Sequence, residues 1–406
     1  MIKKLPFLKV SGTKIVDDAG KNVLLRGVSL GGWLMMEGYM TGGRNIAERT
    51  FRSEFERSLD KDALDDFTRS YRNNFIQEED IKTIRSWGAN CVRIPFNYRL
   101  IEHENRPFSL NPEGLECLDR VVRWCEKHSL YCILDMHSAP GSQNQDWHSD
   151  CSDKPELFAA EFNKDRYLRL WYFLASHYKE VSAIAGYDIL NEPVVPLHDE
   201  WQVKDLYLKA TKEIRDAGDK HILFLEGNVW AQRLDFLGRP ADKNTAYSIH
   251  AYPPIDFTFN FEKDLRYPGK AQGLVWDRKK LDLLAKPYKI FVDFVNVPLY
   301  VGEFGVNARD GLYGEIDWVR DVVSIFKKNE FHWTYWTYKT VASYIYPDGI
   351  YRYTKNPPWV SRQGPIFGWE TFASLWPKHR DRIISSWRTE NFAVNEKLLA
   401  VLKEYW

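Results

Sequence analysis

The sequence has 406 residues, of which 44% are hydrophobic and 28% are charged, an ordinary composition for a globular protein. Lys and Arg number 56, as do Asp and Glu, so the formal charge is zero. The sequence has no basic stripe that would bind nucleic acid, and no apolar run approaches the ~20 residues that cross a bilayer. We therefore expect a monomer with neither a nucleic-acid nor a membrane partner, and a single domain over residues 1–406.

Aromatic residues make up 15% of the chain, and five cysteines are present. We expect most aromatic side chains in the core and a minority free to stack on the flat faces of a ligand such as a sugar. Cys91 and Cys132 lie in apolar, strand-like runs, which predicts reduced, buried thiols. No secretory signal is visible between Met1 and Val10, which favours the cytoplasm, or secretion if a leader was removed.

Short β-branched or aromatic runs alternate with amphipathic helical patterns along most of the chain. After a predicted β-hairpin over residues 8–23, the expected strands are Leu24–Val28, Asn90–Pro95, Tyr131–His137, Ile184–Leu190, His221–Glu226, Tyr247–Tyr252, Pro298–Glu303 and Phe331–Tyr338. The expected helices include Glu78–Trp87, Pro112–His128, Arg166–His177, Trp201–Ala217 and Ile316–Lys328. This alternation predicts an α/β fold, a (β/α)8 TIM barrel with elaborated loops on its catalytic face. An open doubly wound sheet is the alternative, but it usually carries a glycine-rich phosphate turn after its first strand.

The C-terminal part of the chain departs from this alternation. Residues 341–388 are rich in Pro, Gly, Trp and Tyr, which predicts a long loop with short helices on the catalytic rim. Residues 391–406 are predicted to form a terminal helix.

Polar side chains follow the predicted strands where these end. They are Arg93, His137, Asn191, Glu192, Glu226, His250, Tyr252, Glu303 and Trp336. Because the carboxyl ends of all barrel strands open on one face, we expect these side chains to form one site. No motif assigns a task to Glu226.

Two of these carboxylates suit the cleavage of a glycosidic bond. A retaining glycosidase needs an acid and a nucleophile about 5–5.5 Å apart. We expect Glu192 to be the general acid/base, with a pKa raised by burial or by a nearby negative charge. Glu303 would be the nucleophile, held ionised by Arg93 and Tyr252. We expect no metal and no cofactor.

Six motifs in the chain resemble those of glycoside hydrolase family 5. They are GANCVRIPF (88–96), ILDMHSAPGSQN (133–144), YDILNEP (187–193), IHAY (249–252), YVGEFG (300–305) and WTYWTYK (333–339). The resemblance implies a retaining barrel with its acid/base after strand 4 and its nucleophile after strand 7. It also implies that Asn191 binds the sugar 2-hydroxyl and that His137 and His250 orient carboxylates or a hydroxyl.

A narrower resemblance is to the exo-β-1,3-glucanases of that family. It rests on LRGVSLGGWLMMEGYMT (25–41) and APGSQN (139–144). It implies that Glu37 and Tyr39 hold the terminal glucosyl unit and that Trp336 stacks beneath it. The chain differs from that subgroup after Asn144, where it reads QDWHSD, and over 42–72.

Other side chains after the strands have two interpretations. Trp147 and Trp230 are candidate sugar platforms or loop braces. His103, His128 and His148 match no compact set of metal ligands and are interpreted as structural.

The residues and the resemblance together predict a retaining, exo-acting β-glycoside hydrolase that cleaves β-1,3-gluco-oligosaccharides or β-glucosides. The alternatives within the family are a β-mannosidase or mannanase and a β-1,4-glucanase (cellulase). Two further alternatives are a non-catalytic carbohydrate-binding barrel and a metal-dependent hydrolase that uses His137 and His250.

Overall fold

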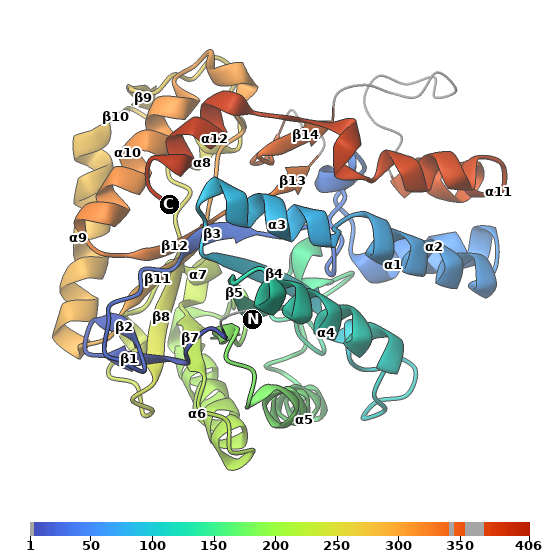
Figure 1. Cartoon of the computed structure of the whole chain (residues 1–406), viewed down its shortest axis with the longest axis horizontal. Helices are drawn as coiled ribbons and strands as arrows, with labels where there is room; N and C mark the ends of the chain where they lie inside the picture. The colour runs from blue at the N-terminus through green and yellow to red at the C-terminus, as the bar shows by residue number, and fades with distance from the viewer. Residues whose placement is uncertain (1–3, 341–344, 354–368) are drawn as a thin grey trace.

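The structure is a computed structural model that describes residues 4–340, 345–353 and 369–406. At its centre, eight parallel strands close into a barrel in the order β11-β12-β3-β4-β5-β6-β7-β8 (Figure 1). The strands are β3 (Arg26–Ser29), β4 (Cys91–Asn97), β5 (Tyr131–Ser138), β6 (Ile184–Asp188), β7 (Ile222–Glu226), β8 (Thr245–His250), β11 (Leu299–Phe304) and β12 (His332–Tyr335). Each overlaps one predicted strand, and the predicted (β/α)8 barrel is confirmed.

Long helices surround the barrel. They are α3 (Glu78–Trp87), α4 (Pro112–Lys127), α5 (Glu161–Tyr178), α6 (Glu200–Asp216), α9 (Arg278–Val295) and α10 (Glu315–Lys328). Helix α4 shows why the sequence folds this way: the Asn111 side chain caps its start, and Leu118, Val121 and Cys125 are buried on one face. Helix α3 ends at Gly88, whose φ of 110° favours glycine. Shorter pieces are α7 (Asn228–Ala231), α8 (Ile255–Thr258), β9 (Gly269–Ala271) and β10 (Leu274–Trp276).

The N-terminal hairpin covers the end of the barrel opposite the carboxyl ends of the strands. Strands β1 (Leu8–Ser11) and β2 (Lys14–Asp17) pair antiparallel across a turn. Leu8 and Ile15 are buried in a cluster with residues near the amino ends of the strands, including Tyr131. The hairpin therefore closes the bottom of the barrel with apolar side chains.

A second group of helices lies to one side of the barrel (Figure 1). It consists of α1 (Glu48–Ser58), α2 (Lys61–Asn74) and α11 (Trp369–Ser386), and it packs through aromatic rings such as Phe67 against Trp376. Helix α11 falls within the predicted rim loop. The prediction of only short helices there is wrong, because aromatic side chains of α11 bury themselves against α1 and α2. Residues 341–344 and 354–368 of that loop lie outside the described residues.

The terminal helix is shorter than predicted. Strand β15 (Phe392–Val394) pairs with β14 (Tyr351–Tyr353), which in turn pairs with β13 (Lys339–Thr340). Helix α12 (Glu396–Lys403) begins only after Asn395, whose side chain accepts a hydrogen bond from the Leu398 amide. The predicted start at Asn391 is therefore wrong, because a strand and a helix cap lie before the helix.

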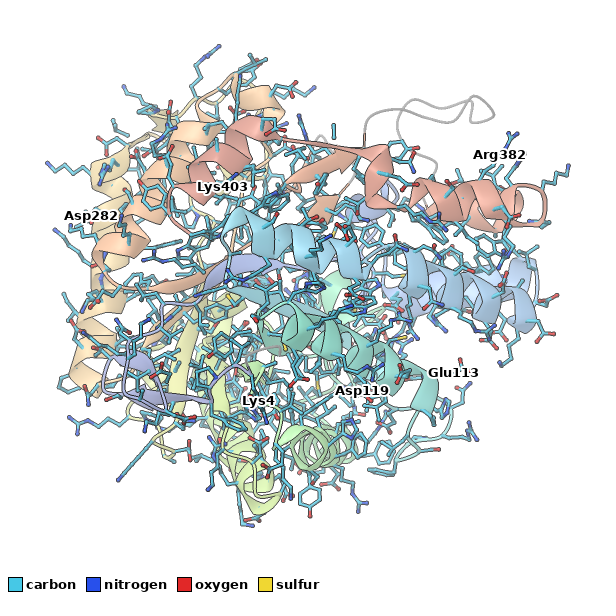
Figure 2. The ribbon with its side chains drawn as sticks, viewed as in Figure 1. Lys4, Glu113, Asp119, Asp282, Arg382 and Lys403 are labelled. Atoms are coloured by element: carbon cyan, nitrogen blue, oxygen red, sulfur yellow. The ribbon has the colours of Figure 1, made fainter. Side chains whose placement is uncertain are left out.

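Charged side chains such as Asp282, Arg382 and Lys403 project from the outer helices (Figure 2). The five cysteines are buried and free, in agreement with the prediction for Cys91 and Cys132. Among the described residues, no helix has the length and apolar character needed to span a membrane.

The hairpin's contribution to stability is testable with Ile15→Ala. The Ile15 side chain is fully buried, so its truncation should leave a cavity that lowers the free energy of unfolding by about 2–5 kcal/mol. Chemical denaturation measures the change. The control Val275→Ala, at a side chain that is 56% exposed, should stay within about 0.5 kcal/mol of the wild type. Equal effects of the two substitutions would contradict a structural role for the hairpin.

Candidate active site

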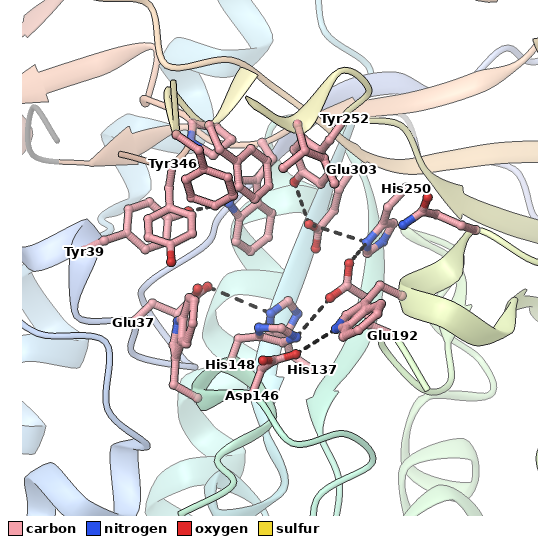
Figure 3. A pocket seen from close by; sticks show the side chains of 18 of the residues that line it. Glu37, Tyr39, His137, Asp146, His148, Glu192, His250, Tyr252, Glu303 and Tyr346 are labelled. Atoms are coloured by element: carbon pink, nitrogen blue, oxygen red, sulfur yellow. Dashed lines mark hydrogen bonds and ion pairs between the residues drawn. The ribbon is translucent and has the colours of Figure 1, made fainter. Parts of the chain in front are cut away.

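The carboxyl ends of the strands open into a pocket of about 380 Å³ (Figure 3). Residues predicted from the sequence line it, namely Glu37, Tyr39, His137, Trp147, Glu192, Trp230, His250, Tyr252, Glu303 and Trp336. Arg93 and Asn191 are fully buried and join this group through hydrogen bonds, from Arg93 to Glu303 and from Arg93 to Asn191. The structure therefore brings all the predicted site residues together.

The Arg93 guanidinium is surrounded by carboxyl groups inside the barrel. Its Nη1 donates to Glu303 Oε1 at 2.6 Å and its Nε donates to Asp188 Oδ2 at 3.0 Å. Its Nη2 lies 3.1 Å from both Asp135 Oδ2 and Glu226 Oε1. Burial opposes the charge of Arg93, but these four carboxyl groups outweigh burial and raise its pKa. Burial also raises the pKa of Asp135 to about 8 and that of Asp188 well above its usual range, while the charge of Arg93 opposes this rise in both.

Glu303 lies near the carboxyl end of β11, and each of its carboxylate oxygens accepts a hydrogen bond. Arg93 donates to Oε1, and the Tyr252 hydroxyl donates to Oε2 at 2.7 Å. Two such bonds hold the carboxylate in one orientation. The contacts are those predicted for Arg93 and Tyr252.

Glu192 lies just after β6 with its backbone in the left-handed region, at a φ of 46°. Its amide donates to Glu226 Oε2 at 2.6 Å, and its carbonyl accepts from Asn144 Nδ2 at 2.9 Å. These two bonds hold a conformation that costs about 1–3 kcal/mol for a residue other than glycine. Glu226, which no motif explained, therefore positions the backbone of Glu192.

The Glu192 side chain lies between two imidazoles (Figure 3). His250 Nδ1 is 2.5 Å from Oε1, and His148 Nε2 is 2.9 Å from Oε2. Across the pocket, one oxygen of Glu192 and one oxygen of Glu303 lie within 4.8 Å of each other. The two carboxylates thus face each other at a distance that a single sugar carbon can bridge.

The pKa expected for Glu192 is wrong. Burial raises the pKa of Glu192, but His250 and His148 outweigh burial and hold it well below its usual range. Burial likewise opposes the charge of the imidazoles, but the contact with Glu192 raises the pKa of His148 to about 9, and Glu226, Glu303 and Glu192 raise that of His250. Near neutral pH, the protons of this group therefore reside on the two imidazoles.

Glu37 and Trp336 also line the pocket. Burial raises the pKa of Glu37 to about 8, so its carboxyl group is mostly protonated at neutral pH. The Trp336 indole donates to the Tyr39 hydroxyl at 2.7 Å and lies parallel to the His137 ring, 5.4 Å away. The bond to Tyr39 and the stacking on His137 hold the indole plane in position.

The two candidate platforms differ in how they are held. The Trp230 indole donates to Asp146 Oδ2 at 2.7 Å from a turn in which residues 229–231 all have positive φ. Trp147 instead packs edge-on against Tyr346, with ring centroids 5.4 Å apart. Asp146 and Tyr346 line the pocket but were not singled out in the sequence. His148 was interpreted as structural, although it follows strand β5 as directly as Trp147 does.

Glu192, His250 and Glu303 also offer ligand atoms at a spacing suited to a metal ion. However, Glu303 already accepts from Arg93 and Tyr252, and the charge of the guanidinium opposes a second cation at the same oxygens. The geometry favours carboxylate chemistry over metal binding.

Two carboxylates that face each other at the carboxyl end of a (β/α)8 barrel define a glycoside hydrolase. A family model described as cellulase, glycosyl hydrolase family 5, matches residues 54–341. The chain belongs to this family of enzymes.

Three relatives illustrate the range of the family. A β-xylosidase from Phanerodontia chrysosporium is 32% identical over 98% of this chain and 83% of its own length. Endoglucanase C from Acetivibrio thermocellus is 30% identical over 69% of this chain and 89% of its own length. A glucan 1,3-β-glucosidase from Blumeria graminis is 32% identical, over 52% of this chain and 51% of its own length.

The fold agrees with that of a solved endoglucanase, Cel5A from Thermotoga maritima. The TM-score is 0.61, and the match covers 93% of this chain and 96% of that chain. At 22% identity this likeness concerns the fold alone.

The buried acid Glu37 should make stability depend on pH. Its pKa is about 8 in the folded protein against an ordinary value of 4.5, so between these values only the folded state retains the proton. Wild-type stability therefore falls as the pH rises through this window, whereas Glu37→Gln lacks this dependence. The variant should gain stability relative to the wild type by up to about 1.4 kcal/mol per pH unit.

Urea unfolding at several pH values measures this difference. The exposed Glu404→Gln serves as a control for the loss of one surface charge. A constant difference between Glu37→Gln and the wild type from pH 5 to 8 would contradict the raised pKa.

Proposed function

We propose that the protein is a retaining β-glycosidase that works by double displacement, with Glu303 as nucleophile and Glu192 as acid/base. The observation that supports this most is the distance of at most 4.8 Å between their nearest oxygens. Retaining enzymes have their carboxyl groups about 5–5.5 Å apart, whereas inverting enzymes leave about 6.5–9.5 Å for a water molecule.

In the first step, a Glu303 oxygen bonds to the anomeric carbon while the bond to the leaving oxygen breaks and Glu192 delivers a proton to that oxygen. In the second step, Glu192 removes a proton from water, and the water oxygen displaces Glu303 from the sugar. Asn191 Oδ1 accepts from Arg93, while Asn191 Nδ2 has no acceptor among the described residues. That amide is thus free to donate to the sugar 2-hydroxyl.

The wall of the pocket supports action on chain ends. The Tyr346 ring lies 5.0 Å from Tyr39, 5.4 Å from Trp147 and 5.5 Å from Phe259, measured between centroids. Among the described residues, these rings contact one another along one side of the pocket, which supports a site closed to a continuing polysaccharide there. The residues 42–72, by contrast, form helices α1 and α2 and contribute no residue to the pocket lining.

We propose a terminal β-D-glucosyl unit as the sugar, on β-1,3-gluco-oligosaccharides or simple β-glucosides. The relation to the glucan 1,3-β-glucosidase, the presence of Glu37, Tyr39 and Trp336 in the pocket lining, and the hydrogen bond from Trp336 to Tyr39 support this choice. A second candidate is a β-xyloside, because the β-xylosidase relative matches 98% of this chain. The endoglucanase relative keeps β-1,4-glucans as an alternative, and β-mannosides are a further one.

A purely carbohydrate-binding role is disfavoured, because both carboxylates and Arg93 stand in hydrogen-bonded positions suited to catalysis. A monomeric state and a cytoplasmic location stay predictions from the sequence.

Azide rescue tests the two assigned roles. Glu303→Ala and Glu192→Ala should each lower kcat for an aryl β-glucoside by roughly 10²–10⁴-fold or more. Azide should restore turnover in both, with α-glucosyl azide from Glu303→Ala and β-glucosyl azide from Glu192→Ala, because the azide occupies a different face of the sugar in each case. Proton NMR identifies the anomers. An α-anomer as the first product of the wild type would contradict retention.

Exo action predicts the products from short oligosaccharides. With laminari-oligosaccharides labelled at the reducing end, the wild type should release one monosaccharide at a time from the other end, as seen by chromatography. Tyr346→Ala should open the wall and raise the share of internal cleavage at least several-fold, whereas Tyr172→Ala, at an exposed side chain on α5, should not.

Aryl β-glucosides, β-xylosides and β-mannosides, compared by kcat/KM, identify the sugar. Internal fragments as the first products of the wild type would contradict exo action and favour an endoglucanase.

A further inference from the structure

We propose that His148 shares the catalytic proton with Glu192, storing it between turnovers and passing it to the carboxylate when a glycosidic bond breaks. This inference rests on the proposed function and assigns a role to a histidine that the sequence indicated to be structural. His148 lies in a short turn, η3 (Trp147–Ser149), that lines the pocket.

The geometry connects His148 directly to the oxygen that would react. Its Nε2 lies 2.9 Å from Glu192 Oε2, and its side chain is only 14% exposed, so water competes little for this contact (Figure 3). The Asn144 amide is 3.2 Å from the same nitrogen. Protonated Nε2 can donate to Glu192, and neutral Nε2 can accept from Asn144. Both protonation states therefore have a partner.

The surrounding charges support a proton on His148. Against the opposing effect of burial, Glu192 just after β6 and Asp146 on its own loop raise its pKa to about 9, and Glu37 from the loop after β3 adds to this only where it is ionised. The neighbouring ring of His137, 5.9 Å away, adds no charge near neutral pH because burial lowers its pKa to about 3. His148 is thus the protonated imidazole on the Oε2 side of Glu192.

His250 is less suited to release its proton. It contacts Glu192 Oε1, but its ring also lies 3.2 Å from Glu226 Oε1 and 3.6 Å from Glu303 Oε2. Three carboxylates around one imidazole hold its proton strongly. His148 contacts only one of these carboxylates directly, that of Glu192, so the proton on His148 is more easily released than the proton on His250.

The proton balance closes over one turnover. During bond cleavage, the proton moves from His148 Nε2 to Glu192 Oε2 and on to the leaving oxygen, which leaves a neutral imidazole and a carboxylate. During hydrolysis, a water proton moves to Glu192 and back to His148, while the water oxygen bonds to the anomeric carbon and the ester to Glu303 breaks. The net reaction converts the glycoside and water into a free sugar and an alcohol. His148 and Glu192 return to their starting protonation states.

His148→Gln tests this role, because glutamine preserves a hydrogen bond but cannot store a proton. For substrates whose leaving group needs protonation, such as alkyl β-glucosides, kcat/KM should fall about 10²-fold. For a 2,4-dinitrophenyl β-glucoside, which leaves without a proton, it should fall only a few-fold. The alkaline limb of the kcat/KM profile should move to lower pH by at least one unit, because Glu192 alone then holds the proton.

His198→Gln is the matched control, since that histidine has an 83% exposed side chain and pairs with Asp199 away from the pocket lining. Equal losses for both leaving groups, with an unmoved alkaline limb, would show that His148 only packs and would overturn the proposal. If Glu192→Gln itself shows no dependence on the leaving group, the proposed function fails instead. Should His148→Gln not fold, the wild-type profile still decides: an alkaline limb near pH 9 is expected, and one below pH 7 would overturn proton storage.

Discussion

One buried guanidinium, that of Arg93, is the interaction on which the reaction centre depends. It lies on β4 and bonds to carboxyl groups from neighbouring and opposite strands, including Glu303 and Glu226. Glu226 in turn holds the amide of Glu192 in a left-handed conformation. The orientation of both proposed catalytic carboxylates therefore traces back to a single cation. Removing one partner from a buried ion pair of this kind typically costs about 3–5 kcal/mol, so loss of Arg93 would disturb the barrel and the site together.

Much of the fold was predictable, because barrel strands are buried on both faces and read as continuous apolar runs between amphipathic helices. Prediction failed where tertiary contacts decide the structure. Helix α11 forms against α1 and α2, which no local pattern in residues 341–388 reveals. The strand at Phe392–Val394 exists because β14 offers it a partner, so the terminal helix starts later than its apolar pattern suggested.

The candidate site was predictable where a residue lies at or shortly after the carboxyl end of a strand, as for Glu192, Glu303 and Tyr252. His148 and Asp146 lie on a loop, and only the folded chain shows that they face Glu192 and Trp230. The protonation states of Glu192 and its two neighbouring histidines could not be predicted from the residue types either. Burial alone would raise the pKa of a carboxyl group, but two adjacent imidazoles reverse the direction. Charge balance in a pocket depends on distances that spacing along the chain does not encode.

The aromatic wall around Tyr346 has an evolutionary consequence. Tyr346 lies beyond the last barrel strand, whereas Glu192 follows β6 and Glu303 lies near the carboxyl end of β11. Under the proposed function, the side chain that limits the saccharide and the carboxylates that cleave its bond are therefore encoded by separate stretches of the gene. Under the proposed exo action, changes in chain length between β13 and β14 would alter the position of Tyr346 without displacing the carboxylates, so a descendant lineage could change from terminal to internal cleavage and keep the same chemistry.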